Sequence, residues 1–565
     1  RTGAEGRADL VVSFEGETVA KAALAVGQGT EEGDDVAFEG VRIPDVKLWY
    51  PWTLGGQPMY DFAVSFDGGE AYEWRSGVRV FETYVDEFTG GRAWKVNGLK
   101  FFVQGGNWIA TDSFLLNGDS ERYEAEVRLH RHSGFNLIRV WGGGLPESDH
   151  FYQACDEAGI AVFQEFWMSG DNNGRWGGSY DYPFEKDAYL EMVEDTVLRL
   201  RGHPSLMFWG GGNELWPASK SPPPVIRAGL EKTVAALDDR FLILSSMDGG
   251  YDGLNMSMHS DSFALAVKDG PYGFLSIDRY YSEPNPGMTN GSSVTVAFQP
   301  EVGGSSMVRL SGLKRMGLAD SGSYPGRFDA DTPDLWSFHK FQGYTYSGPD
   351  GEERDAIWDY GPPASLSGYV ARANMACAQQ YQALFEGFSA KAFGPAASGG
   401  KTGVILWKSQ SPWPALRGFI YDWWLESVGM GDGVRLGLGG GGRWKAQLDL
   451  SEGGGVDVVN RGPEPLVGGG KVDVSAFTFK GEEVQRVGFE VEGGVGQASV
   501  RSVGLEDLSP FKSGLDGLGT VLVRVSASWR GSEENREPVQ TWYWLRREGG
   551  RWTQDYEDMG EWRSE

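Results

Sequence analysis

The stretch SLMFWGGGNELW (205–216) decides how the middle of this chain is interpreted. Four of its first five residues are apolar, three glycines follow, and Asn213 and Glu214 then stand side by side. This order is typical of a buried strand that ends in a polar loop. A buried carboxylate is costly unless it is paired or opens into a cleft. We therefore expect Glu214 to have a function at the end of this strand.

Apolar, strand-like runs alternate with helix-like segments on both sides of this stretch. The runs are FFVQGGN (101–107), NLIRVWGGG (136–144), IAVFQEFW (160–167), LMFWGGGNE (206–214), FLILSS (241–246), VTVAFQPE (294–301) and GVILWKSQ (403–410). Strands that are apolar throughout, at this interval, indicate parallel strands covered by helices. Four or more such units suggest a (β/α)8 barrel. A doubly wound sheet is the alternative, but no G-x-G-x-x-G follows the first strand.

The two ends of the chain have a different pattern. Residues 1–85 contain short alternating runs such as YDFAVSF (60–66), and residues 437–565 look alike after a glycine-rich linker at 437–442. Such runs between turn residues are typical of antiparallel sandwiches. The predicted fold class is multidomain β and α/β. An immunoglobulin-like β-sandwich (1–85) precedes a (β/α)8 TIM barrel (86–436), and a C-terminal β-sandwich follows.

Composition restricts the partners. The 51 basic and 79 acidic residues give a net charge of −28, which argues against nucleic acid and anionic membranes. No apolar run approaches the length of a transmembrane helix. Two cysteines exclude a disulfide scaffold, and the six histidines lack metal-binding spacing, so we predict neither a metal nor a cofactor. The 22 tryptophans suit stacking on sugar rings, although core packing explains most aromatic residues.

Polar and aromatic residues gather at the predicted strand ends, where barrel chemistry takes place. Glu214 and Glu301 fit the carboxylate pair of a retaining glycosidase, which must lie about 5–5.5 Å apart. Desolvation should keep Glu214 protonated as the acid/base, and Arg139 could hold Glu301 ionised as the nucleophile. Either glutamate could instead be a helix cap or a surface ion pair, and Arg139 a structural partner. No G-x-S-x-G motif supports a serine hydrolase.

Several longer strings resemble glycoside hydrolase family 2, in the branch of β-mannosidases and exo-β-glucosaminidases. They are GGNWIATDSF (105–114), NLIRVWGGGLPESDHFYQACDEAGI (136–160), FQEFWMSGDNNGR (163–175), HPSLMFWGGGNE (203–214) and FQPEVGGSSM (298–307). The strings QQYQALFEGFSAK (379–391) and GVILWKSQSPWPALRGFIYDWW (403–424) are most similar to plant-type endo-β-mannosidases.

The resemblance implies that Glu214 is the acid/base and Glu301 the nucleophile, with Asn213 at the sugar 2-hydroxyl. The other residues implied in substrate binding are Trp108, Asp112, Arg139, Trp141, Glu165, Trp167 and Trp407. The implied activity is retaining hydrolysis of β-mannosidic linkages, with Manβ1-4GlcNAc of N-glycan-type oligosaccharides as the substrate. The alternatives are an exo-β-D-glucosaminidase or exo-β-mannosidase with the same pair, and a non-catalytic sugar-binding remnant.

One departure concerns the N-terminal side. Family members begin with a jelly-roll sugar-binding domain, whereas this chain opens directly in the next sandwich. We expect that the domain was lost, that the sequence is a fragment, or that a separate polypeptide carries it. Because the jelly roll helps to wall the active site in the family, this expectation bears on whether the chain acts alone.

Overall fold

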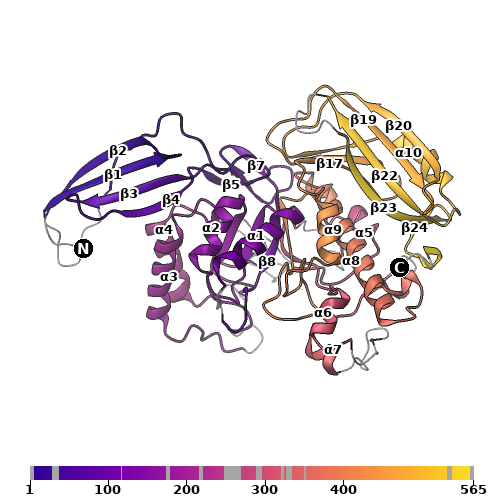
Figure 1. Cartoon of the computed structure of the whole chain (residues 1–565), viewed down its shortest axis with the longest axis horizontal. Coiled ribbons are helices and arrows are strands. Elements are labelled where there is room, and N and C mark those ends of the chain that lie inside the picture. The colour runs from indigo at the N-terminus through magenta and orange to yellow at the C-terminus, as the bar shows by residue number, and fades with distance from the viewer. Residues whose placement is uncertain are drawn as a thin grey trace.

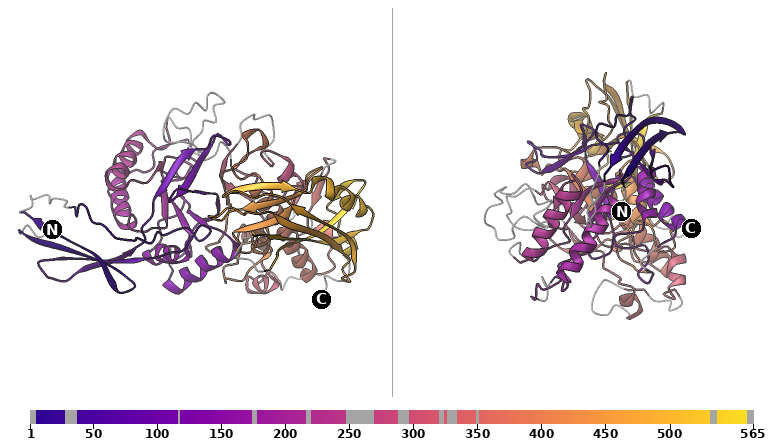
Figure 2. Two further views of the ribbon diagram at one scale, coloured as in Figure 1. Left: turned by 90° about the horizontal axis from the view of Figure 1, so that it is seen from above. Right: turned by 90° about the vertical axis from the view of Figure 1, so that its left-hand side faces the viewer.

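The computed structural model describes residues 5–27, 37–115, 118–173, 178–215, 220–246, 269–287, 296–319, 324–325, 334–348, 351–530 and 537–559. A central α/β unit lies between an N-terminal sheet at one end of the molecule and a C-terminal β domain at the other (Figure 1). The left view of Figure 2 shows the same succession from above. Among the described helices, none is both long and apolar enough to span a membrane.

Seven parallel strands form the central sheet, in the order β12-β11-β10-β9-β8-β16-β13. They are β8 (Val103–Trp108), β9 (Leu137–Val140), β10 (Ala161–Glu165), β11 (Leu206–Gly210), β12 (Leu242–Ile243), β13 (Phe298–Val302) and β16 (Gly403–Leu406). The longer helices between them are α1 (Ser120–Ser133), α2 (Asp149–Ala158), α3 (Lys186–Leu200), α4 (Pro224–Leu237) and α8 (Leu366–Ser389). Neighbouring strands separated by helices confirm the predicted fold class.

Side chains on these strands alternate between two cores. Phe163 of β10 belongs to the inner cluster, with Phe208 and Phe298. Its neighbour Val162 belongs to the outer cluster, which packs against the helices. Because successive strand residues point to opposite faces, this alternation decides which polar residues enter the barrel.

A short segment extends the sheet beyond β13. The N–H of Gly270 donates to the carbonyl of Glu301 at 2.8 Å, and the N–H of Gly303 donates to the carbonyl of Pro271 at 2.8 Å. Residues 269–271 therefore run beside β13, in the position of a further barrel strand. The described residues contain seven regular parallel strands, and this segment adds the backbone contacts of an eighth position.

A small three-stranded antiparallel sheet leads into the barrel. It consists of β5 (Phe81–Val85), β6 (Arg92–Val96) and β7 (Leu99–Phe101). Trp94 of β6 stacks on Phe208 with ring centroids 5.1 Å apart, and its edge meets Phe298 at 4.9 Å. The indole thus fills the inner core of the barrel. The pairing of β5 with β6 crosses the predicted boundary at 85/86.

The N-terminal strands form one antiparallel sheet in the order β2-β1-β3-β4. They are β1 (Gly6–Phe14), β2 (Glu17–Val26), β3 (Tyr60–Phe66) and β4 (Tyr72–Ser76). The small core contains Leu10, Val12 and Tyr60, and residues 38–43 supply apolar side chains against it. Residues 5–27 and 37–76 form this one sheet, and within these residues no second sheet packs against it as in a sandwich.

The C-terminal region consists of two antiparallel sheets. One contains β17 (Trp444–Leu448), β18 (Val456–Asn460) and β21 (Ser499–Val503). The other contains β19 (Gly470–Phe477), β20 (Glu483–Val491), β22 (Thr520–Trp529), β23 (Val539–Glu548) and β24 (Arg551–Thr553). Val458, Val474 and Val523 are buried in the core that these strands share. This is the sandwich arrangement.

Helices join this sandwich to the barrel. Helix α9 (Gly429–Gly437) packs along α8, and its end at Gly437 leads through a turn into β17. Lys445 of β17 donates to buried Glu386 of α8 at 2.8 Å. The remaining elements are α5 (Arg279–Ser282), α6 (Leu310–Arg315), α7 (Asp334–Phe338), β14 (Thr345–Ser347), β15 (Glu353–Asp355), η1 (Trp358–Tyr360), η2 (Ala396–Ser398) and α10 (Leu505–Gly514).

Candidate active site

A fully buried arginine organises the carboxyl ends of the strands. Nη1 of Arg139 donates to Asn107 Oδ1 and to Glu301 Oε1, each at 2.8 Å. Nη2 donates to Glu165 Oε1 at 2.9 Å and to Asn213 Oδ1 at 2.6 Å. Asn107, Arg139, Glu165 and Glu301 lie on four different strands and face the barrel interior because of the strand alternation, and Asn213 follows the end of β11. A guanidinium with several rigid donors suits such a junction.

The glycines at 210–212 allow the chain to pass through this crowded site. A Cβ at Gly210 would lie 2.6 Å from Cγ of Glu165, and a Cβ at Gly212 would lie 2.5 Å from the carbonyl of Met168. Glu214 follows with a left-handed φ of 49°, and its N–H donates to Ser246 Oγ at 3.1 Å. Non-glycine residues in this region are strained and concentrate at functional sites. The glycine run therefore directs Glu214 out of the strand end.

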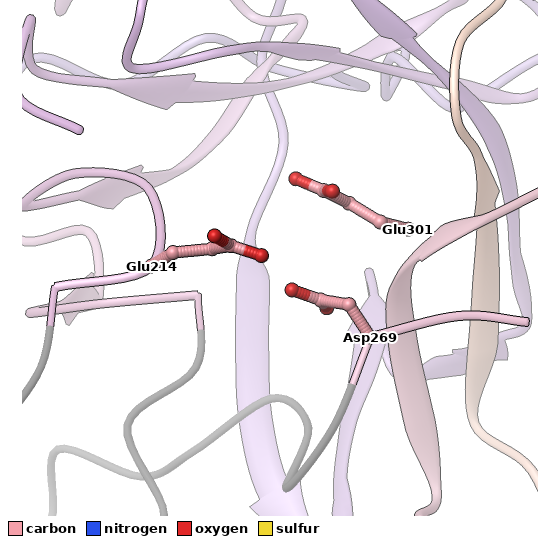
Figure 3. Close-up of side chains that lie close together, drawn as sticks. All are labelled: Glu214, Asp269 and Glu301. Carbon is pink, nitrogen blue, oxygen red and sulfur yellow. The ribbon is translucent and has the colours of Figure 1, made fainter. Parts of the chain in front are cut away.

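Three carboxyl groups meet at this end of the barrel. Oxygens of Glu214, Asp269 and Glu301 all lie within 4.8 Å of one another. The three side chains point toward one another from separate chain segments (Figure 3). Glu301 is 3% exposed and Asp269 is 8% exposed, whereas Glu214 is half-buried. The pair predicted from the sequence is thus brought together, with a third acid beside it.

Sequence reasoning missed Asp269. The tripeptide at 269–271 has no apolar run, so nothing marked it as a strand position. A signal was available in the strand count, because a barrel of eight strands requires another strand between 246 and 294.

Burial and charge set the protonation of these acids. Burial raises the pKa of Glu301 to about 7; the Arg139 guanidinium opposes the shift, and the charge of Glu214 adds to it. Burial also raises the pKa of Asp269 well above its usual value, and the charges of Glu301 and Glu214 raise it further. Arg139 contacts Glu301 as predicted, but its charge does not outweigh burial in the free site.

Glu165 and Arg139 form the charged base of the site. Burial raises the pKa of Glu165, and Arg139 and the N–H of Gly142 oppose that shift. Burial alone would lower the pKa of Arg139, but Glu165 and Glu301 raise it above its usual value. Both side chains are fully buried, so Glu165 supports Arg139 from beneath the acid cluster.

The predicted pocket tryptophans fall into two groups. Trp141 and Trp407 meet edge to face with ring centroids 5.5 Å apart, and both are partly exposed at strand ends. Trp167 is also partly exposed, and it contacts Tyr189 at a centroid distance of 5.4 Å. These three rings remain available to a ligand.

Trp108 does not line a pocket. It is fully buried in the outer cluster, its ring lies 4.8 Å from that of Phe151 in α2, and its Nε1 donates to Glu147 Oε1 at 2.7 Å. The reason is strand alternation: Asn107 points into the barrel, so Trp108 points toward the helices.

Asp112 lies in the loop after β8. Its Oδ1 accepts the N–H groups of Phe114 at 2.7 Å and Leu115 at 2.8 Å, which fixes the loop. The side chain is partly exposed, so a role in binding a sugar hydroxyl remains an expectation.

Carboxylate clusters can also bind divalent cations. Here both oxygens of Glu301 already have donors, because Arg139 occupies Oε1 and Tyr272 donates its hydroxyl to Oε2 at 2.6 Å. The arrangement suits acid–base and nucleophilic chemistry, in which one carboxyl is held by donors while another exchanges a proton.

Part of the barrel matches a known family. Residues 94–240 match the TIM barrel domain of glycosyl hydrolases family 2. This part of the chain is therefore similar to the family 2 glycoside hydrolase barrel domain. The chain is 31% identical over 407 residues to the mannosylglycoprotein endo-β-mannosidase of Lilium longiflorum. The aligned region covers 66% of this chain and 40% of the lily protein. The chain is also 32% identical over 219 residues to β-mannosidase B of Emericella nidulans, covering 38% of this chain and 25% of that protein.

Solved structures share the fold of this chain. The β-D-mannosidase of Dictyoglomus thermophilum has a TM-score of 0.71 at 21% identity, over 96% of this chain and 62% of that one. The exo-chitosanase of Amycolatopsis orientalis has a TM-score of 0.69 at 20% identity, over 96% of this chain and 60% of that one. The chain thus spans less than two thirds of the proteins that it matches.

Proposed function

We propose that this barrel catalyses retaining hydrolysis of β-mannosidic linkages, with Glu301 as nucleophile and Glu214 as acid/base. The observation that carries the proposal is the separation of their carboxylate oxygens, which is within 4.8 Å. Retaining enzymes hold the two carboxyl groups about 5–5.5 Å apart, and inverting enzymes hold them about 6.5–9.5 Å apart.

The proposed reaction has two steps. Glu301 attacks the anomeric carbon while Glu214 gives its proton to the leaving oxygen, and a glycosyl ester forms on Glu301. Glu214 then takes a proton from water, which attacks the same carbon and releases the sugar with net retention. Arg139 and Tyr272 fix the two oxygens of Glu301, so its carboxylate is oriented before the substrate arrives.

Asn213 is the proposed contact for the sugar 2-hydroxyl, which is axial in mannose. Its Oδ1 accepts from Arg139 at 2.6 Å, and its Nδ2 lies 3.3 Å from Ser169 Oγ. These contacts fix the orientation of the amide beside Glu214. Trp141, Trp167 and Trp407 are proposed to stack on sugar rings, with Asp112 accepting from a hydroxyl.

We propose Manβ1-4GlcNAc of N-glycan-type oligosaccharides as the substrate, because the lily relative is named for a mannosylglycoprotein. Hydrolysis of such a glycan should be compared with that of p-nitrophenyl β-mannoside. Endo action predicts turnover of the glycan and almost none of the small chromogenic mannoside. Glu301→Gln and Glu214→Gln should each abolish glycan turnover, and the control Glu490→Gln, on exposed β20, should retain it.

An exo-β-D-glucosaminidase is the second candidate, because a third carboxyl, Asp269, lies beside the pair and could face a cationic amino sugar. Preferential hydrolysis of p-nitrophenyl β-glucosaminide would favour it. If the chain only binds sugar, Glu301→Gln should leave glycan turnover unchanged.

We also propose that sequence outside this chain completes the wall of the pocket, either in the same protein or on a separate polypeptide. The support is the 40% coverage of the lily relative. Activity measured with and without the added jelly-roll domain tests this proposal.

A further inference from the structure

Asp269 is the acid of this site without an assigned role. It begins the segment beside β13, and the next N–H, that of Gly270, is bonded to the carbonyl of Glu301 at 2.8 Å. This backbone contact holds its carboxyl against those of Glu301 and Glu214 (Figure 3). Its placement is therefore fixed by the sheet.

The acids at this end of the barrel differ in the number of hydrogen-bond donors that they receive. They are Glu165, Glu214, Asp269 and Glu301. Glu301 receives Arg139 and Tyr272, and Glu165 receives Arg139 and the N–H of Gly142 at 2.7 Å. Neither oxygen of Asp269 accepts a hydrogen bond from any N–H or hydroxyl of the described residues. Ionised carboxylates in proteins gather donors, and a buried acid without them is far more stable when it is neutral.

The charges that face Asp269 lead to the same result. Glu214 comes from the end of β11, Glu301 from β13, Arg139 from β9 and Glu165 from β10. The terminal nitrogens of Arg139 donate to Asn107, Glu301, Glu165 and Asn213, so Asp269 lies next to two acids and receives no hydrogen bond from the cation. The charge of Arg139 lowers the pKa of Asp269, but burial and the two acids outweigh it. An ionised Asp269 would therefore repel the nucleophile that the reaction needs in its charged form.

We propose that Asp269 is a positioning residue that remains a neutral carboxylic acid through the reaction and donates its proton as a hydrogen bond to the Glu214 carboxyl. This inference rests on the proposed function of Glu214 and Glu301. When Glu214 loses its proton to the leaving oxygen, the hydrogen bond from Asp269 stabilises the carboxylate that results. When Glu214 takes the proton from water, Asp269 keeps its own, so protons balance over the cycle.

Burial supports the proposal, since it raises the pKa of Asp269 well above its usual value, with the neighbouring charges of Glu301 and Glu214 in the same direction. A neutral Asp269 has a second consequence. It could not pair with the ammonium group of an amino sugar, so it favours a neutral sugar in this site over a glucosaminide.

Asparagine and alanine at position 269 test the proposal, because asparagine keeps a hydrogen-bond donor without charge. Asp269→Ala should lower kcat by about tenfold or more with KM nearly unchanged, and Asp269→Asn should recover most of that loss. The pH profile of kcat/KM should keep its acidic limb in Asp269→Asn. If Asp269→Asn is as inactive as Asp269→Ala, or loses only glucosaminide hydrolysis, an ionised carboxylate is required and the proposal is overturned.

An infrared measurement separates this inference from the catalytic assignment. The band of a neutral carboxylic acid at pH 7 should be present in the wild type and in Glu301→Gln, and it should lose intensity in Asp269→Asn. If Asp269→Asn loses that intensity but the wild-type chain hydrolyses no glycoside, the neutral state of Asp269 is supported and the proposed function is wrong. An unchanged band in Asp269→Asn would overturn the neutral state even in an active enzyme.

Discussion

Replacing Arg139 by methionine tests how the acid cluster is held. The substitution removes the guanidinium that lies 2.9 Å from Glu165 and 2.8 Å from Glu301, and both carboxyl groups are almost fully buried. Removing one partner of a buried ion pair costs about 3–5 kcal/mol of folding free energy. We expect a loss of that size at neutral pH, together with loss of activity.

The loss should depend on pH. Burial raises the pKa of Glu301 to about 7 even with Arg139 present, and it also raises that of Glu165. Without the guanidinium both pKa values rise further. A carboxyl with a higher pKa in the folded state binds more protons when folded, so stability falls as pH rises. One extra retained proton is worth about 1.4 kcal/mol per pH unit. Wild-type Glu301 already keeps part of its proton in this range, so the deficit should grow by about 1–2 kcal/mol between pH 6 and pH 7.5.

Urea denaturation at both pH values, followed by tryptophan fluorescence and circular dichroism, measures the deficit. Arg240→Met is the matched control, since Arg240 pairs with buried Asp238 at 2.6 Å away from the site. Asp238 keeps a donor from Trp209 Nε1 at 2.9 Å, so this control measures the cost of removing a buried arginine outside the acid cluster. A deficit below about 1 kcal/mol in Arg139→Met, or one that does not change with pH, would refute the reasoning.

Four further substitutions have separable outcomes. Gly212→Ala should destabilise the chain by about 1–3 kcal/mol in urea denaturation, because its φ is 152° and its Cβ would meet a backbone carbonyl; an unchanged midpoint would contradict this. Trp407→Ala should raise KM by about tenfold, whereas Trp108→Phe should change stability and leave KM alone; equal effects on KM would contradict the two placements. Lys445→Met should cost about 3–5 kcal/mol, since it removes the cation that pairs with buried Glu386 between barrel and sandwich; a loss under 1 kcal/mol would contradict that estimate.

The sequence predicts the parallel barrel because its strands are buried on both faces. FFVQGGN and IAVFQEFW are apolar runs too short for helices, and the polar residue at the end of each run lies near a strand terminus. The carboxyl ends of parallel strands meet at one edge. Glu214 and Glu301 could therefore be expected to come together, although the contacts of Arg139 required the structure.

Other features could not be predicted because they depend on register or on non-local pairing. Asp269 lies on a segment that behaves as a strand only through backbone bonds to β13. Trp108 and Trp141 both lie at strand ends near a polar residue, and only the alternation within β8 shows that Trp108 faces the helices. Strand β20 has charged residues between its apolar positions, and α10 contains Pro510, so neither element has a clear sequence signal.

The central claim is a double displacement through Glu301, and the stereochemistry of the first product tests it most directly. Proton NMR during cleavage of the Manβ1-4GlcNAc bond should show the β-anomer of the released mannosyl end before mutarotation. A 2-fluoro mannosyl trapping reagent should label Glu301, and Glu301→Gln should abolish the label. Initial release of the α-anomer, or a label on another residue, would contradict the account.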